Sequence, residues 1–157
     1  MNKKKMENKG FTLVELIVVL VILAILAAIL VPALLGYIDR AKEKQYVLNA
    51  KSALTATQAE FSSLYGEGSD LTDTNGKFVR SDVVKKTADT PADTEFWVKI
   101  NATPSTITGN VAVPDNHKHY TVTDAIYIEG GYYITYNGKS WVSTQGTATT
   151  TNYTQIY

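Results

Sequence analysis

The sequence contains no cysteine, so neither a disulfide framework nor a thiolate metal site is available to it. It also lacks an excess of charge, because 15 Lys and Arg balance 15 Asp and Glu to a formal net charge of zero. Chains that bind nucleic acids normally present a basic surface, so no nucleic-acid partner is predicted. With 157 residues, the chain is long enough for one ordinary domain and short for two.

The apolar residues are concentrated near the N-terminus. Residues 16–35 include no charged or hydrogen-bonding side chain. A helix of about twenty such residues spans the roughly 30 Å hydrocarbon core of a bilayer. A buried core helix is the alternative, but in a protein of this size it would show a polar stripe. The run therefore predicts a membrane-inserted helix.

Two residues distinguish this run from a plain anchor. Pro32 lies inside it, removes one backbone hydrogen bond and is expected to loosen or kink the helix. Glu15 lies at its start, where a carboxylate near hydrocarbon favours a cationic partner. An interfacial Glu15 in contact with water is the alternative. Upstream, residues 1–10 carry four Lys and one Glu, like the start of a secretory signal, but no A-x-A cleavage site follows the run.

Residues 9–15, KGFTLVE, followed at once by the apolar run, resemble the prepilin signature. This signature is the processing site of type IV pilins and type II secretion pseudopilins. The resemblance covers residues 3–44, and the rest of the chain is similar only in general architecture. It implies an α+β, type IV pilin-like fold, in which a long N-terminal helix packs through its second half on a C-terminal antiparallel β-sheet.

The resemblance also implies how the N-terminus is processed. A membrane-embedded prepilin peptidase would cut between Gly10 and Phe11 and would methylate the new amino group of Phe11. Glycine has no side chain, so a protease can approach its backbone closely. The cleavage creates an ammonium group at Phe11, with which Glu15 of a neighbouring subunit could pair during assembly. Thr12 is the other residue to which we assign an assembly role.

Pro32 and Gly36 are predicted to take part in a helix kink or in local melting. Melting of residues 27–36 would let a filament lengthen under load. A static kink that shapes the packing is the alternative.

The partners and the location follow from the same resemblance. Before assembly the chain would be a single-pass protein of the inner or cytoplasmic membrane, with its N-terminus in the cytoplasm and its head outside. A cytoplasmic assembly ATPase and a membrane platform protein would extract it into a helical homo-oligomeric filament, an extracellular pilus. No cofactor is predicted. Removal of residues 1–10 takes away four Lys and one Glu, which leaves a net charge of −3.

The resemblance and the composition together divide the chain into five segments. They are a leader peptide (1–10), a transmembrane and filament-core helix (11–38), an amphipathic helix of the head (39–65), an αβ-loop (66–95), and a β-sheet head domain with a C-terminal tail (96–157). In the second helix, apolar residues with helical spacing predict a face that supports a sheet: Val47, Ala50, Leu54, Thr57, Phe61, Leu64 and Tyr65. Gln58 is assigned to the opposite, polar side. Gly66 is the expected helix stop, and a short helix is possible at residues 81–87.

The last sixty residues are rich in Tyr, Thr, Val and Ile, which favour strands. The candidate strands are residues 96–100, 111–113, 119–123, 125–129, 132–136 and 140–144. Gly130-Gly131 and Asn137-Gly138 are predicted to be two-residue hairpin turns, so the last three strands form an antiparallel meander. Residues 147–157 are expected to form either an edge strand or a flexible tail.

The sequence gives weak signals for other kinds of site. His117 and His119 form an H-x-H pair, with Asp115 as the only near third ligand, and surface histidines are the favoured interpretation. Residues 70–76 lack the ligand spacing of a calcium loop, and a solvated loop is favoured. No triad, paired-carboxylate motif or phosphate loop is present, so no enzyme activity is predicted.

Three functional classes are compatible with these observations. The leading hypothesis is a structural subunit of a type IV pilus, the major pilin or a close paralogue, used in adhesion, motility or biofilm formation. The alternative is a pseudopilin of a secretion or DNA-uptake system, and the third is a membrane-anchored enzyme or receptor. The absence of cysteine removes the C-terminal disulfide loop of many Gram-negative pilins, which is compatible with a Gram-positive source.

Overall fold

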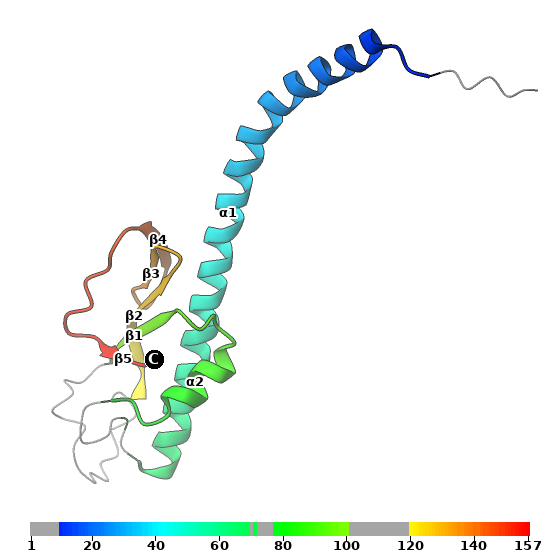
Figure 1. The fold of residues 1–157 in the computed structure, drawn as a ribbon. Helices are drawn as coiled ribbons and strands as arrows, with labels where there is room; N and C mark the ends of the chain where they lie inside the picture. The colour runs from blue at the N-terminus through cyan, green and yellow to red at the C-terminus, as the bar shows by residue number, and fades with distance from the viewer. Residues whose placement is uncertain (1–9, 70, 72–76, 101–119) are drawn as a thin grey trace, which may run out of the picture. The chain divides into compact units, whose positions relative to one another are not determined.

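The structure, a computed structural model, describes residues 10–69, 71, 77–100 and 120–157 (Figure 1). The chain divides into two compact units, Met1–Ala41 and Lys42–Tyr157. Two helices come first along the chain, followed by five strands. The predicted α+β architecture, with a long N-terminal helix and a C-terminal antiparallel sheet, is confirmed.

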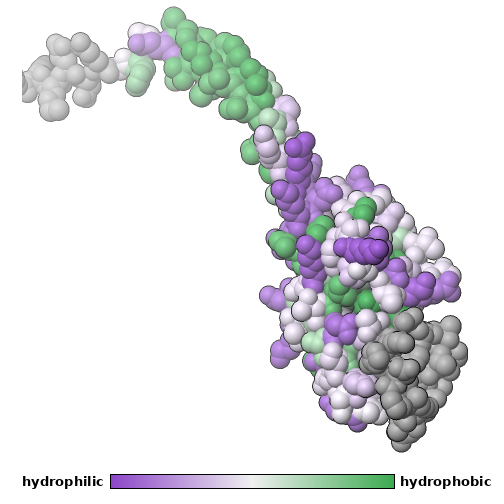
Figure 2. Space-filling view, turned by 180° about the vertical axis from the view of Figure 1, so that it is seen from behind, coloured by the Kyte–Doolittle hydropathy of each residue, from purple (hydrophilic) through white to green (hydrophobic). Residues whose placement is uncertain are grey.

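Helix α1 comprises Leu13–Glu67 and belongs to both units. In the first unit its apolar side chains are exposed, and not one residue of its most hydrophobic stretch is buried within the described part of the chain. This part of α1 forms the continuous hydrophobic surface in Figure 2. The helix is therefore long and apolar enough to cross a membrane.

In the second unit, α1 forms one wall of the hydrophobic core. Its buried residues share one face of the helix: Ala50, Ala53, Ala56, Thr57, Phe61 and Leu64. Two predictions for this face were wrong. Tyr65 is 44% exposed, and Gln58 faces the sheet, where its side chain donates to Tyr120 O (2.6 Å) and accepts from Val122 N (3.0 Å). Gln58 thus joins α1 to the start of β2 through two hydrogen bonds.

Helix α1 ends at Glu67, two residues beyond the predicted last helical residue, Tyr65. Gly68, with φ +66°, takes the left-handed position that follows the last helical turn. Its N–H donates to Tyr65 O (3.2 Å), and Ser69 N–H donates to Leu64 O (3.0 Å), which is the bond pattern of a Schellman motif. Gly66 lies inside the helix, because the left-handed residue is the second glycine and not the first.

The sheet has the strand order β4-β3-β2-β1-β5, and each neighbouring pair is antiparallel. The strands are β1 Glu95–Ile100, β2 Val122–Glu129, β3 Tyr132–Tyr136, β4 Trp141–Gln145 and β5 Thr154–Gln155. The predicted meander of the last three long strands is confirmed. The prediction of a separate strand at residues 119–123 was wrong, because Val122 and Thr123 begin β2. Residues 111–113 and 119 lie outside the described residues.

The two predicted hairpin turns differ in length. Glu129 pairs with Tyr132, so Gly130-Gly131 is the two-residue turn expected, and both glycines have positive φ. Tyr136 pairs with Trp141, which makes the second connection four residues long. There Asn137 Oδ1 accepts from the N–H groups of Lys139 (3.1 Å) and Ser140 (2.9 Å). The prediction of a two-residue Asn137-Gly138 turn was wrong because the Asn side chain closes a longer loop.

Alternate residues of the strands face α1 and complete the core. The largest of these buried side chains are Phe96, Val98, Tyr127 and Ile134. A polar contact ties the same face to the helix, since Glu129 accepts from Asn49 Nδ2 (2.8 Å) and Tyr127 OH (2.7 Å). Burial, followed by this hydrogen bond to the carboxylate, raises the pKa of Tyr127, so the phenol stays neutral.

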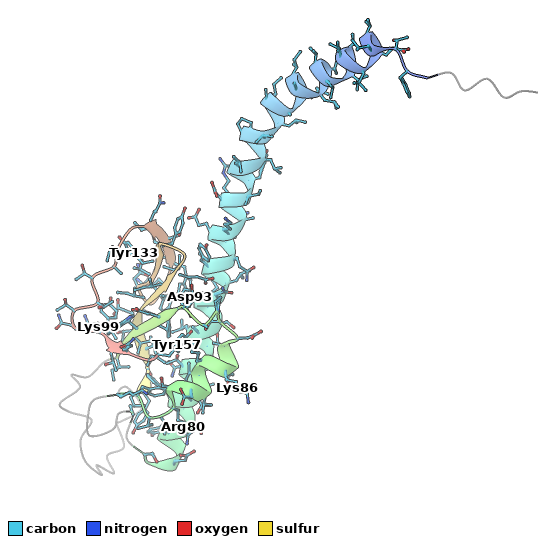
Figure 3. All side chains as sticks on the ribbon, viewed as in Figure 1. Arg80, Lys86, Asp93, Lys99, Tyr133 and Tyr157 are labelled. Carbon is cyan, nitrogen blue, oxygen red and sulfur yellow. The ribbon has the colours of Figure 1, made fainter. Side chains whose placement is uncertain are left out.

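The residues that follow β4 return to the opposite edge of the sheet. Of the two predictions for residues 147–157, an edge strand or a flexible tail, the structure confirms the edge strand. Thr154 and Gln155 pair with β1. Ile156, 1% exposed, enters the core, and its N–H donates to Phe96 O (2.8 Å). Tyr157 lies beside α2 (Figure 3), with its hydroxyl 3.0 Å from Thr90 Oγ1 and its ring under Lys85 Nζ.

Helix α2, Ser81–Ala88, confirms the short helix that was considered possible there. Ser81 Oγ donates to Ile156 O (2.6 Å), which joins α2 to the last strand segment. Arg80, immediately before α2, reaches α1 and donates to Glu60 (2.9 Å) and Glu67 (2.5 Å). The segment between α1 and β1 is therefore fastened to both the helix and the sheet. The sequence analysis rejected residues 70–76 as a calcium loop. Of these, only Leu71 is among the described residues.

Candidate processing and assembly site

The residues before α1 are open to their surroundings. Gly10 is exposed, and a Cβ added to it would meet no atom within 4 Å. Phe11 is 91% exposed, although its side chain is large and apolar. The peptide bond between the two residues is therefore sterically accessible to another protein. Residues 1–9 of the expected leader lie outside the described residues.

Thr12 and Glu15 cap the N-terminus of α1 reciprocally. Thr12 N–H donates to Glu15 Oε2 (2.9 Å), and Glu15 N–H donates to Thr12 Oγ1 (3.2 Å). The Thr12 hydroxyl also donates to the same carboxylate oxygen (2.7 Å). This is a capping box, which satisfies donors that the first helical turn leaves without partners. The negative charge also lies at the positive end of the helix dipole.

The capping box is the functional contact that the sequence analysis missed. The T-x-x-E pattern at residues 12–15 is the signal that could have shown it. We predicted Glu15 to need a cation, but Thr12 already supplies two donors to its carboxylate. These bonds use only Oε2 of the carboxylate, so an ion pair at Oε1 would add to them. Both ion pairs among the described residues belong to Arg80.

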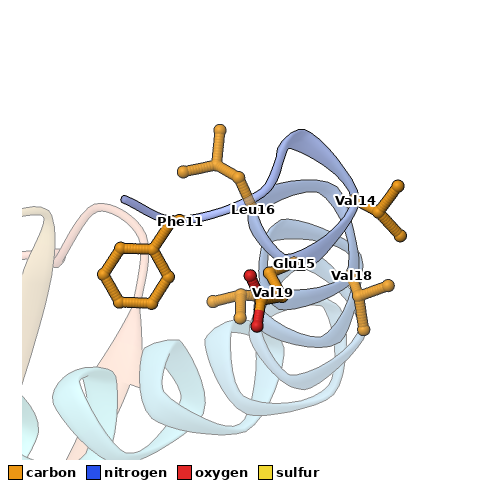
Figure 4. A pocket seen from close by; sticks show the side chains of 6 residues that line it. All are labelled: Phe11, Val14, Glu15, Leu16, Val18 and Val19. Atoms are coloured by element: carbon orange, nitrogen blue, oxygen red, sulfur yellow. The ribbon is translucent and has the colours of Figure 1, made fainter. Parts of the chain in front are cut away.

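A shallow hollow surrounds the carboxylate (Figure 4). Its lining is almost wholly apolar: Phe11, Val14, Glu15, Leu16, Val18 and Val19. A single charged group thus lies on an apolar helix surface, next to the exposed Phe11 ring. This arrangement can accept the apolar side chain of another molecule and, beside it, a cation.

Pro32 and Gly36 lie within the unbroken span of α1. Pro32 has no N–H, so the carbonyl of Ala28, four residues earlier, receives no helix hydrogen bond from it. A Cβ on Gly36 would meet no atom within 4 Å. The structure thus shows a local weakness at Pro32 inside a continuous helix, and melting of residues 27–36 stays a prediction.

The second unit offers little that resembles a reactive centre. Among the described residues, no group of three or more His, Cys, Asp or Glu could hold a metal ion. Asp115, His117 and His119 lie outside those residues. The strongly hydrogen-bonded carboxylates, Glu67 and Glu129, are bound to Arg80 and to Asn49 with Tyr127, and both contacts join elements of the fold.

Comparison with known families locates the match at the same N-terminal residues. Residues 5–31 match the prokaryotic N-terminal methylation motif. The matched span includes Gly10, Phe11 and the capping box, and it ends just before Pro32. No curated protein and no solved structure matches the chain.

Proposed function

We propose that this chain, which carries the prepilin signature of type IV pilins and pseudopilins at residues 5–31, is a structural subunit of a type IV pilus, the major pilin or a close paralogue. The motif points to a structural subunit and not to an enzyme. The observation that carries the proposal is the direct passage from this signature into an apolar helix surface of which nothing is buried within the chain. Such a surface needs first a membrane and then other subunits to cover it.

Processing by a prepilin peptidase is implied by the signature, and we assign the cut to the Gly10–Phe11 bond. The exposure of both residues is compatible with entry into a protease. Thr12 N–H and the hydroxyl that holds Glu15 both follow the cut, so the capping box is available to the mature chain. Methylation of the new amino group of Phe11 keeps its positive charge.

Glu15 is proposed to pair with the Phe11 ammonium of a neighbouring subunit. In apolar surroundings the Coulomb attraction of such a pair is several times stronger than in water. The capping box leaves one carboxylate oxygen, Oε1, without a described partner, and it holds the group at the start of the helix. An incoming subunit would thus be fixed in axial register by a charge contact within an apolar interface.

The same apolar helix accounts for the proposed location. One apolar N-terminal helix and the prepilin signature fit a single-pass membrane protein. We propose that the N-terminus faces the cytoplasm and the head lies outside, until the assembly ATPase and platform protein extract the chain into the extracellular filament. Pro32 and Gly36 would then let the rod stretch under load.

A deletion strain separates the pilus from the alternative, a pseudopilin of a secretion or DNA-uptake system. Electron microscopy should show long surface appendages that are lost on deletion and restored by the gene. Unchanged appendages together with lost secretion or transformation would favour the pseudopilin.

Point variants test the site itself. Glu15→Ala should give a cleaved, membrane-held protein that forms few filaments. Asp39→Ala, which removes another exposed acidic residue of α1, is the matched control and should leave the filament yield unchanged. Normal filament yield from Glu15→Ala would exclude the proposed pairing. Gly10→Ser should block maturation, and a mature Phe11 terminus in that variant would move the processing site.

A further inference from the structure

Strand β4 is an edge that nothing in the described structure protects. It pairs only with β3, and its ladder has no bulge. Its five residues, Trp141–Gln145, include no charge and no proline. Natural edge strands usually carry such features because an open edge is a template for pairing with another chain. The opposite edge differs, since β5 has only two residues.

The hydrogen-bonding parity of β4 shows which of its backbone groups are open. Gly146 N–H donates to Gly131 O, so this pair of opposite residues is hydrogen-bonded. Hydrogen-bonded and non-hydrogen-bonded pairs alternate along an antiparallel ladder. Val142 and Thr144 therefore direct their N–H and C=O groups toward β3. Three residues direct theirs to the open edge: Trp141, Ser143 and Gln145.

We propose that β4 pairs with β4 of a second copy of this chain, antiparallel and centred on Ser143. In this register all three outward-facing residues find partners. Ser143 pairs with the partner's Ser143, and Trp141 pairs with the partner's Gln145. A two-fold contact uses the same surface on both copies, and the three outward-facing residues are symmetric about Ser143.

The side chains are compatible with this register. Val142, 52% exposed, faces away from the core and would lie opposite Thr144 of the partner subunit, and β-branched residues pair well across strands. Ser143 Oγ is buried and has no hydrogen-bond partner among the described residues. This side chain lies on the core side of the sheet, so the contact between the two copies of Ser143 uses their backbone N–H and C=O groups. Lys139 would face the partner's Thr147, so no like charges meet.

The symmetry of the contact determines what it can join. The two-fold axis is perpendicular to the sheet, so the strands, and the part of α1 that packs against them, run in opposite directions in the two copies. Subunits of one polar filament all run in the same direction and cannot make this contact with each other. If the proposed pilus function holds, β4 pairing joins filaments that run antiparallel, as filaments from two facing cells do. The inferred activity is therefore cell-to-cell aggregation.

Cysteine cross-linking tests the register directly, because the natural chain has no cysteine. Two full-length variants, Val142→Cys and Thr144→Cys, are purified in detergent, mixed and mildly oxidised. Residues 142 and 144 of the two copies form a non-hydrogen-bonded pair, with Cα atoms about 4.5–5.5 Å apart, within disulfide range. Disulfide-linked dimers should form in the mixture, and each variant alone should give at least tenfold less, because its own cysteines lie about 8 Å apart.

Two further variants control for the fold and the contact. Val83→Cys, at an exposed valine of α2, replaces Val142→Cys in the matched control mixture and should give no dimer. Ser143→Pro removes an N–H that the β3 ladder does not use, so the monomer should keep its melting temperature while cross-linking falls at least tenfold. Absence of dimers from folded variants, or equal dimer yield from Val142→Cys alone, would overturn the proposal.

The experiment also separates this inference from the proposed function. If cells display filaments but the purified variants form no cross-link in detergent, the β4 contact is refuted and the role as a filament subunit is kept. If the cross-link forms but deletion changes neither filaments nor secretion, the β4 contact is kept and the proposed subunit function is refuted. Where both hold, Ser143→Pro cells should display filaments and lose aggregation.

Discussion

The hydroxyl of Tyr46, on α1, lies where a Cβ on Gly130 would have to be. Gly130 is the first residue of the β2–β3 turn and has φ +58°, so it is constrained both by its backbone and by the close approach of the ring. Tyr46 is itself held by the ring of Tyr132, with centroids 5.6 Å apart. The turn thus packs directly against the helix.

Gly130→Ala should destabilise the head more than Gly131→Ala. Both positions have positive φ, which costs an L-residue about 1–2 kcal/mol. A Cβ on Gly131 would meet no atom within 4 Å, whereas one on Gly130 would displace Tyr46 and add about 1–3 kcal/mol. Thermal and urea unfolding of the two variants measure the difference. Equal losses would mean that Tyr46 gives way without cost.

The contact between Arg80 and Glu67 should make stability depend on pH. The hydrogen bond from Arg80 holds the pKa of Glu67 below its usual value, and Ser63 adds to this. A carboxylate whose pKa is lowered by folding stabilises the fold above its unfolded pKa of about 4.3, and this contribution disappears as the pH falls through the folded value. Glu67→Gln should therefore be less stable than the natural chain at neutral pH and equal to it in acid.

Salt is the control for that experiment, because the Glu67 side chain is half-exposed. Ionic strength of 1 M should reduce the difference at neutral pH. Asp39→Asn, which removes an exposed carboxylate without an ion pair among the described residues, is the matched control variant. A difference that persists unchanged in acid would mean that the Gln variant perturbs packing instead.

Thr12→Val should loosen the start of α1, because it removes the hydroxyl that caps Glu15 N–H and keeps the shape of the side chain. Loss of an N-cap side chain costs about 0.5–2 kcal/mol. Hydrogen exchange of the Glu15 amide in detergent should rise several-fold, while Thr12→Ser stays near the natural rate. Filament yield should follow the same order, since a frayed first turn no longer holds the Glu15 carboxylate in place.

Ile156→Ala should destabilise the packing of the αβ-loop as well as that of β5. Removal of a buried Ile side chain costs about 2–5 kcal/mol. The loss should extend to α2, because Ser81 Oγ donates to the Ile156 carbonyl. Increased proteolysis near α2, compared with the exposed-site control Val142→Ala, is the expected readout. Protection of α2 equal to that of the natural chain would show that its other contacts, those of Arg80 and Thr90 among them, hold this segment without Ile156.

Local patterns in the sequence were sufficient for part of this structure. The apolar run, the two-residue Gly130-Gly131 turn and the β-favouring composition of β2 and β3 are local properties of the sequence. The errors arose where distant residues decide. Gln58 looked like a solvent-facing residue until β2 supplied Val122 N–H as its partner. The interaction of Arg80 with α1 depends likewise on tertiary packing.

The assembly site shows a different division. The motif at residues 9–15 was recognisable, and so was the exposed helix behind it. The bonds between Thr12 and Glu15 were missed because the search was for a cation and not for a helix cap. One chain does not include the Phe11 ammonium of a neighbouring subunit. The proposed pairing of that group with Glu15 is therefore tested by the assembly experiments.

The position of β5 also sets an order of events in folding. Trp97 of β1 pairs with Gln155, which follows it by most of the head sequence. Bringing such distant residues together is slow compared with closing the Gly130-Gly131 hairpin. Until β5 pairs, β1 is an open edge of the sheet and the core next to Phe96 is incomplete. The packing of Ile156 is therefore expected to be a late step, which closes a core that the hairpins have already begun.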